Sequence, residues 1–155
     1  MISGAQLAHH SICGGVAALG FGVLFNIGPR LLPWCAVSGA LALAIRTTGL
    51  QLGWSLEAAS FAAALAVGGA VRVAEHRLGV SRNSLDVAGC IPMIPGGFAA
   101  KAILGLFALS TSPAATPDQV LIQSVAGALR VMFTIGAMGT GLALPSLLLR
   151  VRRPL

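Results

Sequence analysis

Two prolines and a lysine interrupt an apolar stretch that is long enough to cross a bilayer. The stretch covers residues 87 to 109, and its middle reads Ile91-Pro92-Met93-Ile94-Pro95-Gly96-Gly97, with Lys101 four residues later. Each proline lacks a backbone N–H and clashes with the turn before it, so the carbonyls of Ala88 and Ile91 lose their helical partners. Unwound backbone persists at membrane depth only inside protein or beside a water-filled cavity, and transporters place substrate sites at such breaks. A kinked structural helix is the alternative, but the lysine beside the break favours a transport site.

A second cation is predicted at the same depth. Lys101 lies eight residues from Leu109, and Arg130 lies ten residues from Val120. At about 1.5 Å per residue, the two cations lie roughly 12 and 15 Å below one outer boundary. Each costs at least about 2.5 to 3.5 kcal/mol there unless something compensates the charge. No acid of this chain is expected that deep, so the negative charge must come from a substrate, a partner subunit or water. A structural ion pair with an acid of a neighbouring subunit remains the alternative for one of the cations.

A helix that begins after Pro95 would direct its first N–H groups towards the unwound backbone. The positive end of a helix dipole favours a carboxylate, and the two glycines allow close approach. Gly97 and Lys101 stand four residues apart, so one anion could meet backbone donors and the ammonium group together. The freed carbonyls could hold a substrate ammonium group or a coupling cation. We therefore expect a carboxylate-bearing solute, with the substrate-binding residues Pro92, Pro95, Gly96, Gly97, Lys101 and Arg130.

The composition requires a membrane. The chain has 155 residues, of which 56% are hydrophobic and 9% are charged, so polar residues are too few to cover a soluble globule. A net charge of +6 could indicate nucleic acid, but the arginines form no basic run with interleaved aromatics. The three cysteines match no metal or redox motif and are expected to be small buried side chains. No nucleophile with a base, carboxylate pair or metal cluster supports an enzyme, and we expect neither a metal nor a cofactor.

The hydropathy pattern predicts an all-α integral membrane protein, a single transmembrane domain of about five helices. The expected spans lie near residues 5–27, 31–50, 56–71, 87–109 and 120–149, with the fourth broken at the proline segment. The second span is the weakest, because Pro33 and Arg46 interrupt it, and it could be a re-entrant hairpin. Arginines in the basic loop 72–86 and in the C-terminal tail predict that these parts are cytoplasmic, with the N-terminus outside. A related subunit could form an inverted repeat with this odd number of spans.

Small residues predict close helix packing. Ala58, Ala62 and Ala66 recur at four-residue spacing, and Ala137 is followed by Gly141. Such spacing lets helix backbones approach closely in lipid. Thr116 and Pro117 are expected to begin the last helix, as a cap and as a first-turn residue.

Several motifs, taken in order along the chain, resemble those of the threonine/serine exporter family. They are Phe25-Asn26-Ile27-Gly28-Pro29-Arg30; Trp34-Cys35-Ala36 with Gly39 and Arg46; Gly49-Leu50 with Trp54-Ser55; Ile91-Pro92-Met93-Ile94-Pro95-Gly96; and Gly141-Leu142 with Pro145 before a basic tail. More closely, the chain resembles the small YjjB-type subunit of the split form. The resemblance implies a secondary exporter of the bacterial inner membrane, in which this subunit works with a larger YjjP-type subunit. Single-chain members carry both halves, and solutes exported in the family include threonine and serine or succinate.

This chain departs from the family pattern around the expected site. An aromatic hydroxyl often follows the Pro-Gly pair by four residues, but Ala100 stands there and the chain has no tyrosine. Lys101 and Arg130 are also not expected from the pattern. Two cations suit a doubly anionic solute such as succinate slightly better than a zwitterionic amino acid.

Three further residues are assigned to gating or to the inner mouth. Arg30 could collect anions, although a positive-inside anchor is its structural alternative, and Asn26 could cap or bridge helix ends. Arg46 completes this group. A proton or cation could be coupled to export, and further copies of this chain could complete the assembly. The competing hypothesis is a non-conducting subunit that only holds its partner in the bilayer.

Overall fold

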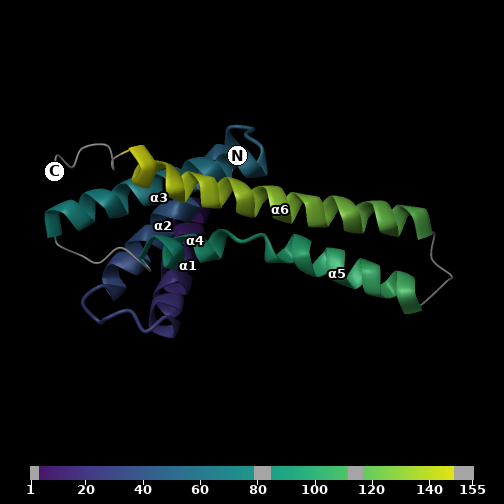
Figure 1. Cartoon of the computed structure of the whole chain (residues 1–155), viewed down its shortest axis with the longest axis horizontal. Helices are drawn as coiled ribbons and strands as arrows, with labels where there is room; N and C mark the ends of the chain where they lie inside the picture. The colour runs from purple at the N-terminus through teal and green to yellow at the C-terminus, as the bar shows by residue number, and fades with distance from the viewer. Residues whose placement is uncertain (1–3, 79–84, 112–116, 149–155) are drawn as a thin grey trace. The chain divides into compact units, whose positions relative to one another are not determined.

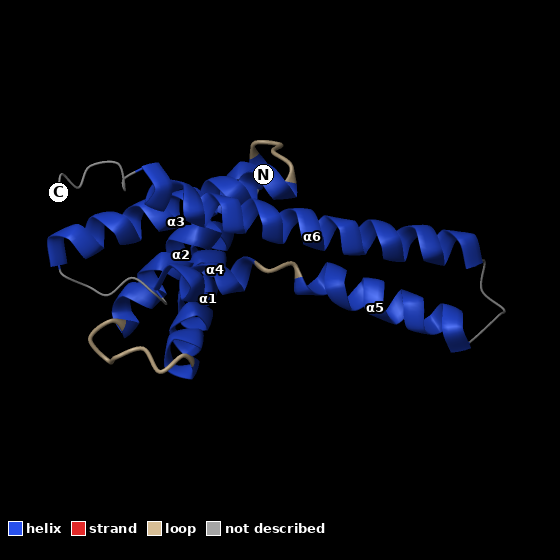
Figure 2. Ribbon diagram, in the orientation of Figure 1, coloured by secondary structure: helices blue, strands red, loops and turns tan. Residues whose placement is uncertain are grey.

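The structure, a computed structural model, describes residues 4–78, 85–111 and 117–148. Every regular element in these ranges is a helix (Figure 2). In chain order (Figure 1) the elements are α1 (Gly4–Leu24), α2 (Leu32–Gln51), α3 (Leu56–Leu78), α4 (Leu85–Cys90), the short 3-10 helix η1 (Ile91–Met93), α5 (Gly96–Thr111) and α6 (Pro117–Leu148). The expectation of an all-α membrane protein is confirmed.

The expected number of five spans is too high. In the described ranges, three helices are long and apolar enough to cross a membrane: α1, the part Leu56–Glu75 of α3, and Asp118–Leu148 of α6. The bent pair of Leu85–Met93 and Gly96–Thr111 makes a fourth if it counts as one broken span. The helix α2 is long enough but not among these candidate spans, because Pro33, Arg46 and several hydroxyl-bearing residues lower its mean hydropathy. It is nevertheless one uninterrupted helix and not a hairpin.

The predicted break at the prolines is confirmed. α4 ends at Cys90, η1 covers the next three residues, and α5 begins only at Gly96. Pro92 lies inside η1 and Pro95 directly precedes α5, as expected from residues that remove a backbone donor. α6 also begins at the predicted Pro117, whereas the expected cap Thr116 lies outside the described residues.

Both ends of the segment 72–86, expected to be a cytoplasmic loop or short helix, are helical. α3 continues through Leu78, so Arg72 and Arg77 belong to its last turns. The guanidinium Nη1 of Arg72 lies 3.4 Å from Oε2 of Glu75, one turn further on. Leu85 and Asp86 already belong to α4, and residues 79–84 lie outside the described part.

The chain divides into two compact units. Unit 1 comprises residues 1–93 and 137–155, and unit 2 comprises residues 94–136. Unit 1 contains α1 to α4, η1 and the end of α6, and unit 2 contains α5 and the first part of α6.

Glycines bring the helices of unit 1 close together. A Cβ added to Gly15 of α1 would lie 2.9 Å from the Ala36 carbonyl oxygen of α2. A Cβ on Gly141 of α6 would lie 2.7 Å from the Phe61 carbonyl oxygen of α3. The close helix packing predicted at Gly141 is therefore present. Side chains at these positions would force the backbones apart, so the glycines set the spacing of the helices.

Two details of the predicted packing are wrong. The buried stripe of α3 contains Ala59, Ala63 and Val67, one residue further on than the predicted stripe that begins at Ala58. Of the cysteines, Cys35 and Cys90 are buried as expected, but Cys13 is exposed on α1.

Candidate functional site

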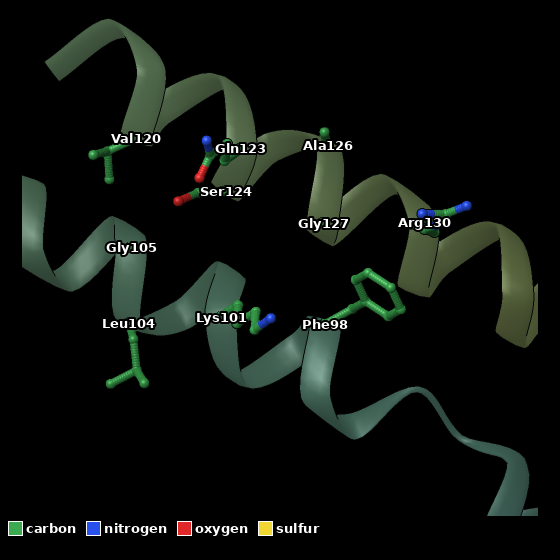
Figure 3. Close-up of a pocket in the computed structure, with 10 residues that line it drawn as sticks. All are labelled: Phe98, Lys101, Leu104, Gly105, Val120, Gln123, Ser124, Ala126, Gly127 and Arg130. Carbon is green, nitrogen blue, oxygen red and sulfur yellow. The ribbon is translucent and has the colours of Figure 1, made fainter. Parts of the chain in front are cut away.

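A groove lies between the two helices of unit 2. Its volume is about 500 Å³. The ten lining residues (Figure 3) are Phe98, Lys101, Leu104 and Gly105 of α5 and Val120, Gln123, Ser124, Ala126, Gly127 and Arg130 of α6. The helices approach each other closely beside it: a Cβ added to Gly127 would lie 3.4 Å from the Phe98 carbonyl oxygen.

The groove brings the two predicted cations together. Lys101 and Arg130 come from different helices, and both line it with exposed side chains. The guanidinium carbon of Arg130 lies 5.2 Å from the centroid of the Phe98 ring, a cation–π contact that joins α6 to α5 (Figure 3). Thr134 Oγ1 donates a 2.7 Å hydrogen bond to the Arg130 carbonyl one turn further along α6.

Two neutral polar residues extend the site beyond the sequence prediction. Gln123 contributes an amide, and Ser124, which is 3% exposed, contributes a hydroxyl that points towards Gly105 (Figure 3). Gln123 precedes Arg130 by seven residues, or two helical turns, so the two residues share one face of α6. That spacing was the signal in the sequence that could have revealed Gln123.

The electrostatic character of the groove favours an anion. Of its ten lining residues two are cationic and none is acidic. An ammonium group, a guanidinium group, an amide and a hydroxyl can all donate hydrogen bonds to carboxylate oxygens. Among the described residues no group of three or more His, Cys, Asp or Glu side chains could hold a metal ion.

The backbone at the proline break is more fully hydrogen-bonded than expected. The Ile94 carbonyl accepts the Gly96 N–H at 2.8 Å. The Pro95 carbonyl accepts the N–H groups of Phe98 at 3.0 Å and Ala99 at 3.2 Å. These bonds use the N–H groups of three of the first four residues of α5. Of the free N–H groups expected there, that of Gly97 remains.

The glycines after the break are open to the surroundings. Gly96 and Gly97 are exposed, and a Cβ added to either would meet no atom within 4 Å. They do not line the groove, although Gly97 precedes the lining residue Phe98 directly. Pro95 is buried, and Pro92 belongs to unit 1.

Asn26 is a helix terminator. It adopts the left-handed conformation, with φ of 54°, as the second residue after α1 ends at Leu24. Its N–H donates to the Val23 carbonyl and the Ile27 N–H donates to the Gly22 carbonyl, both at 2.9 Å. This pair of bonds is a Schellman motif, in which asparagine tolerates the conformation better than most residues. The expected capping role of Asn26 is therefore fulfilled by its backbone.

The other two residues assigned to gating lie in different settings. Arg30 is exposed in the turn that joins α1 to α2. Arg46 of α2 is partly buried, and its Nη1 donates a hydrogen bond to the Met93 carbonyl at the break. Arg46 is therefore placed against the break, within unit 1.

Replacing Gly105 with alanine should destabilise unit 2, because the new methyl group would fall on Ser124 Oγ. Overpacking of this kind costs about 1 to 3 kcal/mol. Detergent-solubilised Gly105→Ala should therefore unfold earlier in a denaturant titration. Adding Ser124→Ala should restore part of the loss, because it removes the hydroxyl. Gly139→Ala is the matched control, since its Cβ would meet nothing within 4 Å. Equal destabilisation by Gly105→Ala and Gly139→Ala would contradict the close approach.

Comparison with known proteins assigns the chain to a group of transporters. The family model described as "Threonine/Serine exporter, ThrE" matches residues 10–148. An uncharacterized protein of Haemophilus influenzae is 30% identical over 149 residues, which are 96% of this chain and 50% of that protein. The chain therefore spans about half the length of this curated relative. No solved structure matches significantly.

Proposed function

The chain belongs to the threonine/serine exporter family, and from that premise we propose that it is the small membrane subunit of a bacterial secondary exporter for small carboxylate-bearing metabolites. The single observation that carries the proposal is the groove of unit 2, which contains two cations and no acid among its lining residues. Lys101 is the fixed charge for the solute carboxylate, and Arg130 is a second or gating charge. Gln123 and Ser124 supply neutral hydrogen-bond donors.

The solute is a dicarboxylate such as succinate, or threonine or serine. A dicarboxylate can pair one carboxylate with each cation, whereas a zwitterion brings an ammonium group that no lining carboxylate receives. Gly97, which directly precedes the lining residue Phe98, offers its N–H to the solute at the edge of the groove. Pro92, Pro95 and Gly96 contribute by keeping the backbone unwound before that turn.

A larger YjjP-type subunit completes the exporter. The relative from Haemophilus influenzae supports this part of the proposal, because half of that protein lies outside its match to this chain. The complex resides in the bacterial inner membrane, with the N-terminus of this chain outside and the C-terminus inside. Arg30 collects anions at the inner mouth, and an imposed gradient of protons or another cation drives export.

A flux assay tests this function directly. The chain is co-expressed with a larger YjjP-type subunit, and the purified complex is reconstituted into vesicles loaded with succinate, threonine or serine. We expect efflux of at least one of these solutes that responds to an imposed proton gradient. Solute efflux equal to that of vesicles with the larger subunit alone would instead identify this chain as a non-conducting scaffold.

A further inference from the structure

One carbonyl at the break is hydrogen-bonded by a side chain from another helix. The carbonyls of Ile94 and Pro95 accept N–H groups from residues that follow them closely in the chain. The Met93 carbonyl instead accepts Nη1 of Arg46, which lies 47 residues earlier, on α2. In an uninterrupted α-helix this carbonyl would accept the N–H of Gly97, four residues further on. The guanidinium group therefore takes the position of a missing backbone donor.

The environment of this bond makes it costly to lose. Met93 is fully buried, with 0% exposure, and Arg46 is itself partly buried. A buried carbonyl that loses its donor keeps its desolvation penalty, and a bond from a charged donor is stronger than one between neutral groups. This hydrogen bond of Arg46 therefore joins a charged donor to a neutral, buried carbonyl.

The prolines alone do not fix this geometry. A proline removes one helical bond, but many proline-containing helices only bend and continue. A bond from a second helix, by contrast, selects one position for the carbonyl. Ser38, on the same helix as Arg46, donates its hydroxyl proton to the Cys35 carbonyl at 2.9 Å, and its Oγ lies 3.5 Å from the Leu85 carbonyl oxygen at the beginning of α4. α2 is thus in contact with the beginning of α4 and with the break itself.

We infer that Arg46 is a positioning residue whose guanidinium group, by binding the Met93 carbonyl, holds the break at residues 91–95 in its observed form, a short 3-10 helix followed by two non-helical residues. A lysine would replace it only in part, because its ammonium group is a compact charge on a flexible stem, without the planar array of donors. This role of Arg46 in the backbone conformation is independent of the proposed function, and only its consequence for transport rests on that function.

Amide hydrogen exchange of the full-length chain tests the inference without any transport measurement. The probes are the N–H groups of Gly96, Phe98 and Ala99, which donate to carbonyls inside the break. In Arg46→Met these amides should exchange at least about tenfold faster than in the wild type. Without the guanidinium group, the segment is held less firmly and the hydrogen bonds of these amides open more often. Arg46→Lys should give a smaller increase. Arg30→Met, which removes an exposed arginine, should leave the three exchange rates unchanged.

A second substitution weakens the same bond from its other side. An ester in place of the amide between Met93 and Ile94 makes the Met93 carbonyl a poorer acceptor. It should accelerate exchange at the three probes in the wild type and add little in Arg46→Met, because both changes act through one bond. If Arg46→Met does not fold, Arg46→Lys takes its place in this comparison.

Two results would overturn the inference. One is unchanged exchange at the three probes in the Arg46 variants. The other is an ester effect that is as large in the Arg46 variant as in the wild type.

Failure of the proposed function would be seen separately, as an absence of solute flux through the wild-type complex. In a complex that does transport, Arg46→Met should lower the maximal rate more than the apparent affinity, because Arg46 does not line the groove.

Discussion

Replacing Lys101 with methionine should reduce solute flux through the reconstituted complex almost to the level of vesicles without protein. Methionine keeps the length and apolar stem of the side chain but removes its charge. The groove then retains Arg130 as its one cation among ten lining residues. A hydrogen bond to a charged group contributes about 1.5 to 3 kcal/mol, so its removal is a loss of roughly tenfold to 150-fold in affinity. Radiolabelled efflux from proteoliposomes measures this change.

A neighbouring substitution separates charge from packing. Ile103 lies two residues further along α5, is 66% exposed and does not line the groove. Ile103→Met should therefore transport at the wild-type rate. Lys101→Arg should retain part of the flux because it keeps the charge, and all three variants should assemble normally. Wild-type flux in Lys101→Met would remove Lys101 from the site.

Replacing Gly39 with valine should strongly destabilise unit 1. A Cβ on Gly39 of α2 would fall against the Ala18 side chain and against the Gly14 carbonyl oxygen, both on α1. Because that oxygen belongs to a helical backbone, it cannot move aside as a flexible side chain would, and α1 and α2 must separate. Overpacking at such a contact costs about 3 kcal/mol, a large share of the stability of a typical domain.

Size-exclusion chromatography after detergent extraction measures the folded fraction of this variant. We expect Gly39→Val to elute mainly as aggregate, and to unfold earlier than the wild type in a denaturant titration. Gly20→Val on α1 is the control, because a Cβ at Gly20 would meet no atom within 4 Å. Equal recovery of both variants as folded protein would show that α1 and α2 do not pack through Gly39.

The local backbone features of this fold could be predicted from the sequence. Pro92 and Pro95 cannot donate helical hydrogen bonds, and the helix is interrupted at both. Pro117 is compatible with the first turn of a helix, and α6 begins there. Simple helix geometry also predicted similar depths for Lys101 and Arg130, and the two side chains line one groove.

Other features depended on information that the local sequence does not contain. Alanine occupies positions 58, 59, 62, 63, 64 and 66 of α3, so stripes that start at Ala58 or Ala59 are nearly indistinguishable by composition. The packing partners decide between them, and the stripe with Ala59 is buried. The link from Arg46 to the Met93 carbonyl joins residues 47 positions apart, and no local spacing indicates it. The number of spans was overestimated because α2 is helical without being sufficiently apolar.

Solute protection of a single cysteine in the groove is the most direct test of the central claim, that Lys101 and Arg130 form a carboxylate site. Gln123→Cys lines the groove, whereas Ile122→Cys, also on α6, is its exposed control outside the groove. Both are made in a chain whose three native cysteines are replaced, and the complex is labelled with N-ethylmaleimide. We predict that the transported carboxylate slows labelling at position 123 but not at 122, and that Lys101→Met abolishes this protection. Labelling at position 123 that is unaffected by the solute, in a complex that transports it, would contradict the account.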